Sequence, residues 1–390
     1  MPSFVAADRP APAGRLALLP ASHVRRAPAR APVAILGVPL DPLTVDETLA
    51  RIAAMVDTGR PHYVVTPNVD FLVQARSDAA LRRILGEADL VLCDGQPLVW
   101  ASRWLGNPLP ERVAGADLAP RLLAQAERLG HRVFLLGAAP EANAAAVARL
   151  RLRHPRLVIA GSFAPPFRPL AEMDHADIIR RVRAAQPHLL LVGFGCPKQE
   201  KWMAMHYREL GVPVCLGLGA TIDFLAGRVR RAPGWMHRAG LEWTYRLWQE
   251  PRRLFRRYAT DLRLFGFALF AQWWALGRRM GRAGGSVRVI PSAGGVLRLR
   301  AAGALDRAAV EAATEAWRRI RAGWGDCELD LADVEVIDST GAAALIVWRR
   351  ELRRRGRRLT IVRARGRVGR QLATFGPADL ATGVLAPLAA

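Results

Sequence analysis

The sequence is poor in residues on which several classes of protein depend. Its four cysteines, Cys93, Cys196, Cys215 and Cys327, are spread over 390 residues and form neither a Cys-x-x-Cys pair nor a Cys/His ligand set. Neither a disulfide framework nor a zinc site is therefore indicated. The same pattern fits a protein of the reducing cytoplasm.

Lysine is almost absent, since only Lys198 and Lys201 occur and all other basic residues are arginine. The 57 basic residues exceed the 34 acidic ones and give a net charge of +23. Such an excess predicts an anionic partner: nucleic acid, anionic lipid headgroups or a phosphorylated substrate. A general bias toward arginine also raises the total, so local clusters of arginine are more informative than the sum.

The usual motifs for nucleotides and metals are missing. The chain has no P-loop and no Gly-x-Gly-x-x-Gly, and no Asp-x-Asp follows a predicted strand in the first 230 residues. We therefore predict neither a metal ion nor a cofactor.

Long apolar segments are missing as well. Residues 1–32 are rich in Pro, Ala and Arg and lack the apolar core of a signal peptide, so we expect a disordered basic tail. The apolar run 264–276 has 13 residues and contains Gln272, whereas a membrane-spanning helix needs about 20. This segment is expected to lie on a membrane and not to cross it.

What is present is an α/β pattern. From residue 33 to about 228, short apolar runs alternate with amphipathic stretches, which predicts a mostly parallel, Rossmann-like sheet flanked by helices. The expected strands are 62–66, 90–93, 133–137, 157–161, 188–193 and 214–219. Open sheets of this kind bind ligands at the carboxyl ends of their strands.

Several polar residues and glycines follow these strands. Asp70 and Asp94 are each placed to act as a general base on a hydroxyl, or simply to cap a helix. The turns that contain Gly137, Gly193 and Gly195 expose backbone N–H groups that suit phosphate. The nearby Gln199 and Glu200 are either part of a site or ordinary exposed residues of a first helical turn.

Residues 229–283 form a segment rich in arginine and aromatic residues. On a helix after Pro251, the residues Leu254, Tyr258, Leu262, Phe265 and Leu269 fall on one stripe, and Arg252, Arg253, Arg256 and Arg263 fall opposite. Phe267, Phe270 and Trp274 then make the end of the helix apolar all round. This predicts a helical appendage bound to an anionic membrane surface, with a basic face over an ordinary packing helix as the alternative.

The motifs become specific when they are taken together, in order, over residues 33–260. They are Thr-x-Asn-x-Asp (66–70), Asp-Gly (94–95), Arg-Val-x-Gly-x-Asp (112–117), Gly-x-Pro-x-Gln-Glu-x-Trp (195–202), Gly-x-Gly-x-x-x-Asp (217–223), Arg-Ala-Pro (231–233), Glu-Trp-x-Tyr-Arg (242–246) and Pro-x-Arg (251–253). The set resembles the WecG/TagA/CpsF glycosyltransferases, glycosyltransferase family 26. The resemblance assigns residues 33–228 to a catalytic domain.

The resemblance implies an inverting transfer from a UDP-sugar, carrying N-acetylmannosamine, its uronic acid or glucose, to a sugar on a polyprenyl diphosphate. Such a reaction serves bacterial cell-surface or exopolysaccharide synthesis. Asp94 matches the catalytic base, and Thr66, Asn68 and Gln199 match other residues of the catalytic pocket.

The resemblance also suggests which residues bind the substrates. The candidates are Arg112, Asp117, Gly137, Gly193, Gly195 and Asp223 in the catalytic domain, and Arg231, Arg246, Arg253 and Arg256 in the appendage, which would reach the substrate diphosphates. Without a metal-chelating acidic pair, stabilisation of the leaving group falls to arginines and helix ends.

Beyond a glycine-rich break at 282–285, residues 286–390 predict a second, small α/β domain left hanging from the membrane anchor. Its Asp338-Ser339-Thr340-Gly341 resembles the central motif of a STAS domain. Ser339 then matches a phosphoacceptor, or Asp338 and Ser339 only cap a helix in a domain that docks a protein partner.

Two other functions compete with a peripheral enzyme on the inner face of the cytoplasmic membrane. One is a catalytically inactive membrane scaffold that recruits partners through the STAS-like domain. The other is a basic nucleic-acid-binding protein, which is disfavoured because no recognition motif accompanies the charge. The donor and acceptor sugars and the formation of a homo-oligomer are left open by the sequence.

Overall fold

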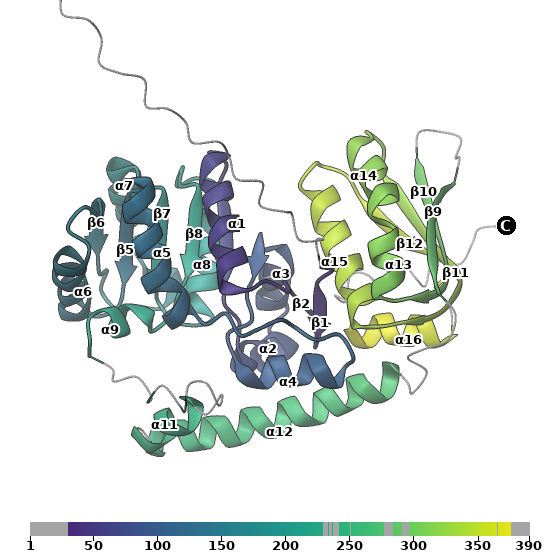
Figure 1. The fold of residues 1–390 in the computed structure, drawn as a ribbon, viewed down its shortest axis with the longest axis horizontal. Helices are drawn as coiled ribbons and strands as arrows, with labels where there is room; N and C mark the ends of the chain where they lie inside the picture. The colour runs from purple at the N-terminus through teal and green to yellow at the C-terminus, as the bar shows by residue number, and fades with distance from the viewer. Residues whose placement is uncertain are drawn as a thin grey trace, which may run out of the picture. The chain divides into compact units, whose positions relative to one another are not determined.

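Figure 1 shows the computed structural model of the chain. The structure describes residues 30–228, 233, 236, 242–249, 251–276, 284–290, 296–364 and 366–375. The predicted basic tail lies outside the described residues except for its last three positions, and so does Arg231.

The larger α/β part of the chain is built on a six-stranded sheet in which every pair is parallel. The strands are β3 (His62–Val65), β4 (Leu90–Val91), β5 (Val133–Gly137), β6 (Ile159–Phe163), β7 (Leu189–Gly193) and β8 (Val214–Gly217). Their order across the sheet is β4-β3-β8-β7-β5-β6. The predicted fold class is confirmed, and each strand overlaps an expected run.

Both faces of this sheet are buried, which explains why its strands are continuously apolar. In β7, Leu189 and Leu191 belong to one hydrophobic core, and Leu190 and Val192 belong to the other. One core is covered by α1 (Val45–Asp57), α5 (Gly115–Leu129), α6 (Pro140–Arg153) and α9 (Thr221–Leu225). The other is covered by α2 (Val69–Ser77), α3 (Ala79–Glu87), α4 (Gln96–Trp104), α7 (His175–Ala185) and α8 (Lys198–His206).

A small antiparallel hairpin, β1 (Val33–Ile35) and β2 (Val38–Leu40), precedes the sheet. Its two turn residues, Leu36 and Gly37, both have positive φ angles, as a type I′ hairpin turn requires. The sequence pattern does not predict this hairpin, because each strand has only three residues and Pro39 lies in the second.

The arginine-rich segment forms α11 (Glu242–Gln249) and the long helix α12 (Pro251–Leu276). Gln272 is buried and joins α12 to the hairpin: its Nε2 donates to the Ala34 carbonyl at 2.9 Å, and its Oε1 accepts from the Leu36 N–H at 2.9 Å. No helix among the described residues is both long enough and apolar enough to span a bilayer.

The predicted apolar stripe of α12 is only partly correct. Phe265 and Leu269 are buried as expected, but Leu262 is 64% exposed and Asp261 is buried instead. The buried face is therefore rotated from the predicted one. Gln272 finds polar partners in the hairpin, and Asp261 pairs with Arg257 of the same helix at 3.7 Å. The side chains of Arg253 and Leu254 lie outside the described part of the helix.

The second domain has a four-stranded sheet in the order β12-β11-β10-β9. Its elements are β9 (Ser286–Ile290), β10 (Leu297–Leu305), α13 (Arg307–Ala312), α14 (Thr314–Ala322), β11 (Cys327–Ile337), α15 (Ser339–Arg353), β12 (Leu359–Val362) and α16 (Gly366–Phe375). The predicted α/β character is confirmed.

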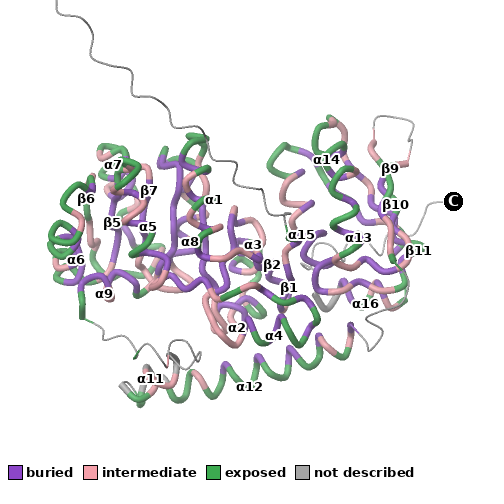
Figure 2. Tube along the Cα trace, viewed as in Figure 1, coloured by how far each residue is buried: buried purple, intermediate pink, exposed green. Residues whose placement is uncertain are grey.

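The expectation that this domain hangs from the anchor is wrong. Helix α15 packs against β1, β2 and α3, and residues of both domains share one hydrophobic core. Figure 2 shows α15 as largely buried. The hairpin that the sequence did not predict thus supplies part of the surface on which the second domain rests, and its apolar strands are fully buried.

Candidate active site

The predicted site residues gather where the carboxyl ends of β3, β4, β7 and β8 meet. The Thr66 hydroxyl, at the end of β3, donates to the Gly217 carbonyl of β8 at 3.0 Å. The Gly219 N–H, after β8, donates to the Gln199 Oε1 at 3.0 Å. Thr66 and Gln199 are therefore both hydrogen-bonded to the same short segment, residues 217–219.

Gln199 and Glu200 are buried, so the alternative that they are exposed first-turn residues is wrong. The Gln199 Nε2 donates to the Glu200 Oε1 at 2.6 Å, while the Glu200 Oε2 is buried without a hydrogen-bond partner among the described residues. Burial raises the pKa of Glu200 to about 7. Sequence reasoning left Glu200 out of the site, although it stands next to Gln199.

The raised pKa of Glu200 predicts a pH effect on stability. Between pH 4.5 and about 7 the folded chain binds this proton more tightly than the unfolded chain, so stability falls as the pH rises through that window. The total loss is roughly 3 kcal/mol above pH 7, from 1.36 kcal/mol per unit of pKa. Glu200→Gln removes the ionisable group and with it this pH-dependent loss, so the variant should gain stability relative to the natural chain as the pH rises.

Thermal melts from pH 5 to pH 8 measure this difference. The matched control is Glu209→Gln, which changes an exposed carboxylate in the turn after α8. Parallel melting curves for the natural chain and Glu200→Gln across the whole range would contradict the assignment.

Asp94 follows β4 and lies half-buried at the start of another helix. Its Oδ2 accepts from the Gly115 N–H, the first residue of α5, at 3.3 Å. It does not cap α4, whose N-cap is Gly95. A Cβ on Gly95 would lie 3.7 Å from the Asn68 Cβ, so the loops that carry Asp94 and Asn68 are adjacent.

Asn68, not Asp70, caps α2, because its Oδ1 accepts from the Phe71 N–H at 3.4 Å. Asp70 instead forms an ion pair with Arg257 of α12 and accepts from Gln74 at 2.9 Å. The appendage is thereby held against the end of β3. Arg257 was not among the predicted arginines, and its ion pairs with Asp70 and Asp261 distinguish it from its neighbours.

Arg112 and Asp117 form a largely buried ion pair of 2.7 Å. The pair lies beside the row of loops that follow β3, β4, β7 and β8. The Val113 N–H donates to the Cys93 carbonyl at 2.8 Å, which places the pair next to the Asp94 turn. The predicted Arg-Val-x-Gly-x-Asp motif therefore packs against the predicted Asp-Gly motif.

The glycines allow close backbone approach. A Cβ on Gly137 would lie 2.6 Å from the Gly193 carbonyl oxygen, and one on Gly193 would lie 3.0 Å from the Gly219 oxygen. Gly195 has a φ of +80°, which favours glycine. The ends of β5, β7 and β8 are thus packed backbone to backbone, leaving their N–H groups near the strand ends.

The remaining predicted residues are placed less directly. Asp223 lies in α9, and burial raises its pKa. The side chains of Arg246 and Arg253 lie outside what the structure describes, and Arg256 is exposed on α12. The roles expected for these three arginines stay predictions.

Ser339 is enclosed between the two domains. Its hydroxyl oxygen accepts from the Asn107 Nδ2 at 2.8 Å, and the same nitrogen donates to the Asp338 Oδ2 at 2.9 Å. Asp338 caps α15 through the Thr340 and Gly341 N–H groups, as one interpretation of the motif predicted. Phosphorylation of Ser339 stays a prediction, and it requires the two domains to separate first.

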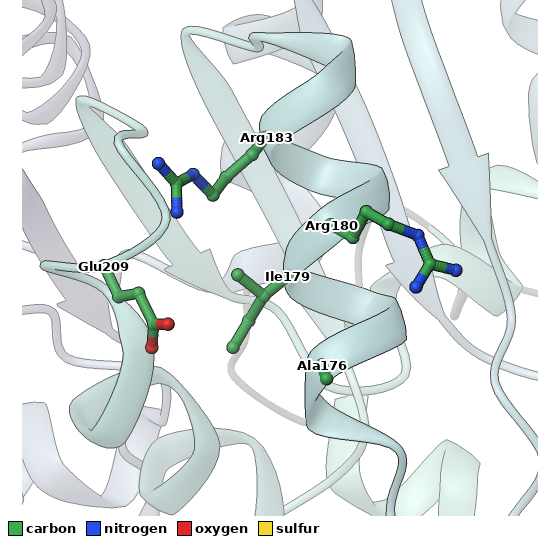
Figure 3. A pocket seen from close by; sticks show the side chains of 5 residues that line it. All are labelled: Ala176, Ile179, Arg180, Arg183 and Glu209. Carbon is green, nitrogen blue, oxygen red and sulfur yellow. The ribbon is translucent and has the colours of Figure 1, made fainter.

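A pocket elsewhere is formed by α7 and the turn after α8 and contains none of the predicted site residues. Figure 3 shows its lining side chains, Ala176, Ile179, Arg180, Arg183 and Glu209. Among the described residues, no three His, Cys, Asp or Glu side chains form a group that could hold a metal ion.

Comparison with known proteins gives two family matches. Residues 33–279 match the model of the glycosyl transferase WecG/TagA/CpsF family, and residues 290–384 match a model described as "Mlab, STAS domain". The chain is similar to N-acetylglucosaminyldiphosphoundecaprenol N-acetyl-beta-D-mannosaminyltransferases. One from Bacillus spizizenii is 32% identical over 51% of this chain and 75% of the relative. One from Staphylococcus aureus strain MW2 is 28% identical over 61% of this chain and 92% of the relative.

Proposed function

Because the chain belongs to the WecG/TagA/CpsF family of glycosyl transferases, we propose that it transfers a sugar from a UDP-sugar to a sugar carried on a polyprenyl diphosphate. The names of its relatives favour N-acetylmannosamine as the donor sugar and an N-acetylglucosamine-bearing diphospholipid as the acceptor. The uronic acid of N-acetylmannosamine and glucose are the alternative donor sugars. The product would enter a bacterial cell-surface polysaccharide or exopolysaccharide.

The observation that carries this proposal is the position of Asp94. Its carboxylate is fixed by the start of α5 and lies beside the loop of Asn68, at the strand ends that also hold Thr66 and Gln199. A base so placed takes the proton from the acceptor hydroxyl. The hydroxyl oxygen then bonds to the anomeric carbon from the face opposite the leaving group, the bond to UDP breaks, and the configuration inverts.

The leaving diphosphate needs positive charge or backbone donors. The glycine-rich turns after β5 and β7 lie close together, as the approach of Gly137 to Gly193 indicates, and backbone N–H groups of such turns bind phosphate. Arg112 lies beside the Asp94 turn and is oriented by Asp117. We assign the stabilisation of the leaving group to these groups and to arginines of the appendage, without a metal ion.

The outward face of α12 supports a peripheral position on the inner face of the cytoplasmic membrane. Its first half exposes Arg252, Arg256 and Arg263, and its second half exposes Phe267, Phe270 and Trp274. The aromatic surface continues onto α4, where Trp100 and Trp104 are about half exposed and Trp104 stacks on Trp273 at 5.4 Å. Arginines at headgroup level beside inserted aromatic rings suit an anionic bilayer.

A donor screen tests the proposed reaction. The purified full chain is incubated with UDP-N-acetylmannosamine, UDP-glucose or the UDP-uronic acid and an N-acetylglucosamine- or glucose-diphospholipid, and the lipid product is identified by mass. We expect one donor and acceptor pair to give an acceptor extended by one sugar. A chain that binds vesicles but extends no acceptor and hydrolyses no donor is a scaffold.

The same assay tests the role of metal. We expect the rate in EDTA to equal the rate with Mg²⁺ or Mn²⁺, because protein groups stabilise the leaving diphosphate. Full loss of activity in EDTA, restored by either metal, contradicts the proposed mechanism but leaves the donor and acceptor assignment intact.

A further inference from the structure

A second pocket lies between α3 of the catalytic domain and α15 of the STAS domain, away from the row of loops. Its lining residues are Gly37, Ala79, Arg82, Arg83, Gly86, Glu87, Ile346, Arg349, Arg350 and Arg353. Half of the ten are arginines and only one is acidic. The cavity volume of about 90 Å³ exceeds the roughly 10–15 Å³ that one water needs, so a phosphate group fits inside.

A single carboxylate lines the pocket beside five arginines. Glu87, the single lining acid, forms an ion pair of 2.7 Å with Arg353. Arg82 bonds to backbone carbonyls, those of Ala75 at 2.8 Å and Arg76 at 2.6 Å. Docking of the STAS domain therefore brings like charges together around one cavity.

Arg350 provides an independent observation. One of its terminal nitrogens donates to the Ala88 carbonyl, but its Nε is buried and has no hydrogen-bond partner among the described residues. A buried guanidinium N–H without a partner costs free energy. The nearby acids Asp41 and Asp89 attract Arg350 electrostatically, but their hydrogen bonds go to other groups. Asp41 accepts from the Val91 N–H, and Asp89 pairs with Arg354 and His62.

We propose that this pocket binds a phosphate-bearing anion, which joins the STAS domain to the catalytic domain. Arginine presents planar pairs of N–H donors that match phosphate oxygens, and an anion in the cavity relieves the repulsion among the five guanidinium groups. The ligand is either a soluble phosphate or the phosphate of a lipid headgroup. The proposal does not depend on the transfer reaction.

Binding of inorganic phosphate to the full chain is measured by calorimetry at constant ionic strength. We expect saturable binding that Arg83→Gln with Arg349→Gln weakens at least ~10-fold, since each helix then loses one phosphate donor. The matched control is Arg180→Gln with Arg183→Gln, which removes the same charge from the pocket in Figure 3. The control should bind phosphate as the natural chain does.

A second arm distinguishes the source of the phosphate. Vesicles of phosphatidylglycerol are compared with vesicles of phosphatidylcholine for the natural chain and both double variants. Weaker binding of phosphatidylglycerol by the Arg83/Arg349 variant alone identifies a lipid headgroup. Hydrogen exchange with phosphate present should protect α3 and α15. The proposal is overturned if the two double variants bind phosphate with the same affinity and bind vesicles with the same affinity. It is also overturned if phosphate protects only the strand-end loops from exchange.

Discussion

Asp94→Asn is expected to lower kcat by at least ~10²-fold, the loss typical of a positioned general base. Asparagine keeps an oxygen that can accept from the Gly115 N–H, so the local structure is preserved while the basic oxygen is lost. The rate of sugar transfer at saturating donor measures the effect. An unchanged thermal melt shows that the loss is chemical.

Two further variants make this result specific. Asp177→Asn changes a partly exposed carboxylate on α7 that pairs with Arg180 and Arg181 of the same helix, and its rate should match that of the natural chain. Asp70→Asn tests the other strand-end carboxylate, which is paired with Arg257. If Asp94→Asn retains near-normal turnover and Asp70→Asn does not, the base is Asp70.

Replacing Phe267 and Trp274 by Asp should abolish most membrane binding. Both rings are largely exposed, at 80% and 69%, so their removal costs the folded chain little. On a bilayer, each buried aromatic ring contributes roughly 1.5–3 kcal/mol, and partial insertion of two gives at least about 2 kcal/mol, or ~30-fold in the partition coefficient. Flotation with anionic liposomes measures the change.

The chain offers a matched control for this double variant. Phe167 and Trp324 are 95% and 96% exposed and lie outside α12, so Phe167→Asp with Trp324→Asp makes the same chemical change elsewhere. We expect the control to float with the liposomes and its binding to weaken as salt rises, because the arginines of α12 act electrostatically. Equal flotation of both double variants would move the membrane-binding surface away from α12.

The sequence by itself determined the parallel sheet and the positions of its ligand-binding ends. The apolar runs that become β3, β5, β7 and β8 were located because a strand buried on both faces is continuously apolar. Polar residues that follow such strands must meet at one edge, which grouped Asp94 with the glycine-rich turns before any contact was known. The resemblance to the glycosyltransferase family added Thr66, Asn68 and Gln199 to this group. The second domain was recognisable for the same reason, from local patterns of apolar residues.

Only the tertiary structure decided which side chains pair across elements. It buried Glu200 beside Gln199, paired Asp70 with Arg257 instead of leaving it as a cap, and enclosed Ser339 against Asn107. Asp70 and Arg257 lie far apart in the sequence, and so do Asn107 and Ser339. Gln199 and Glu200 are neighbours, but the periodicity of apolar residues does not fix where their side chains point. Local pattern specifies which face of an element is apolar, but the packing of other elements specifies which polar groups lose water and must find partners.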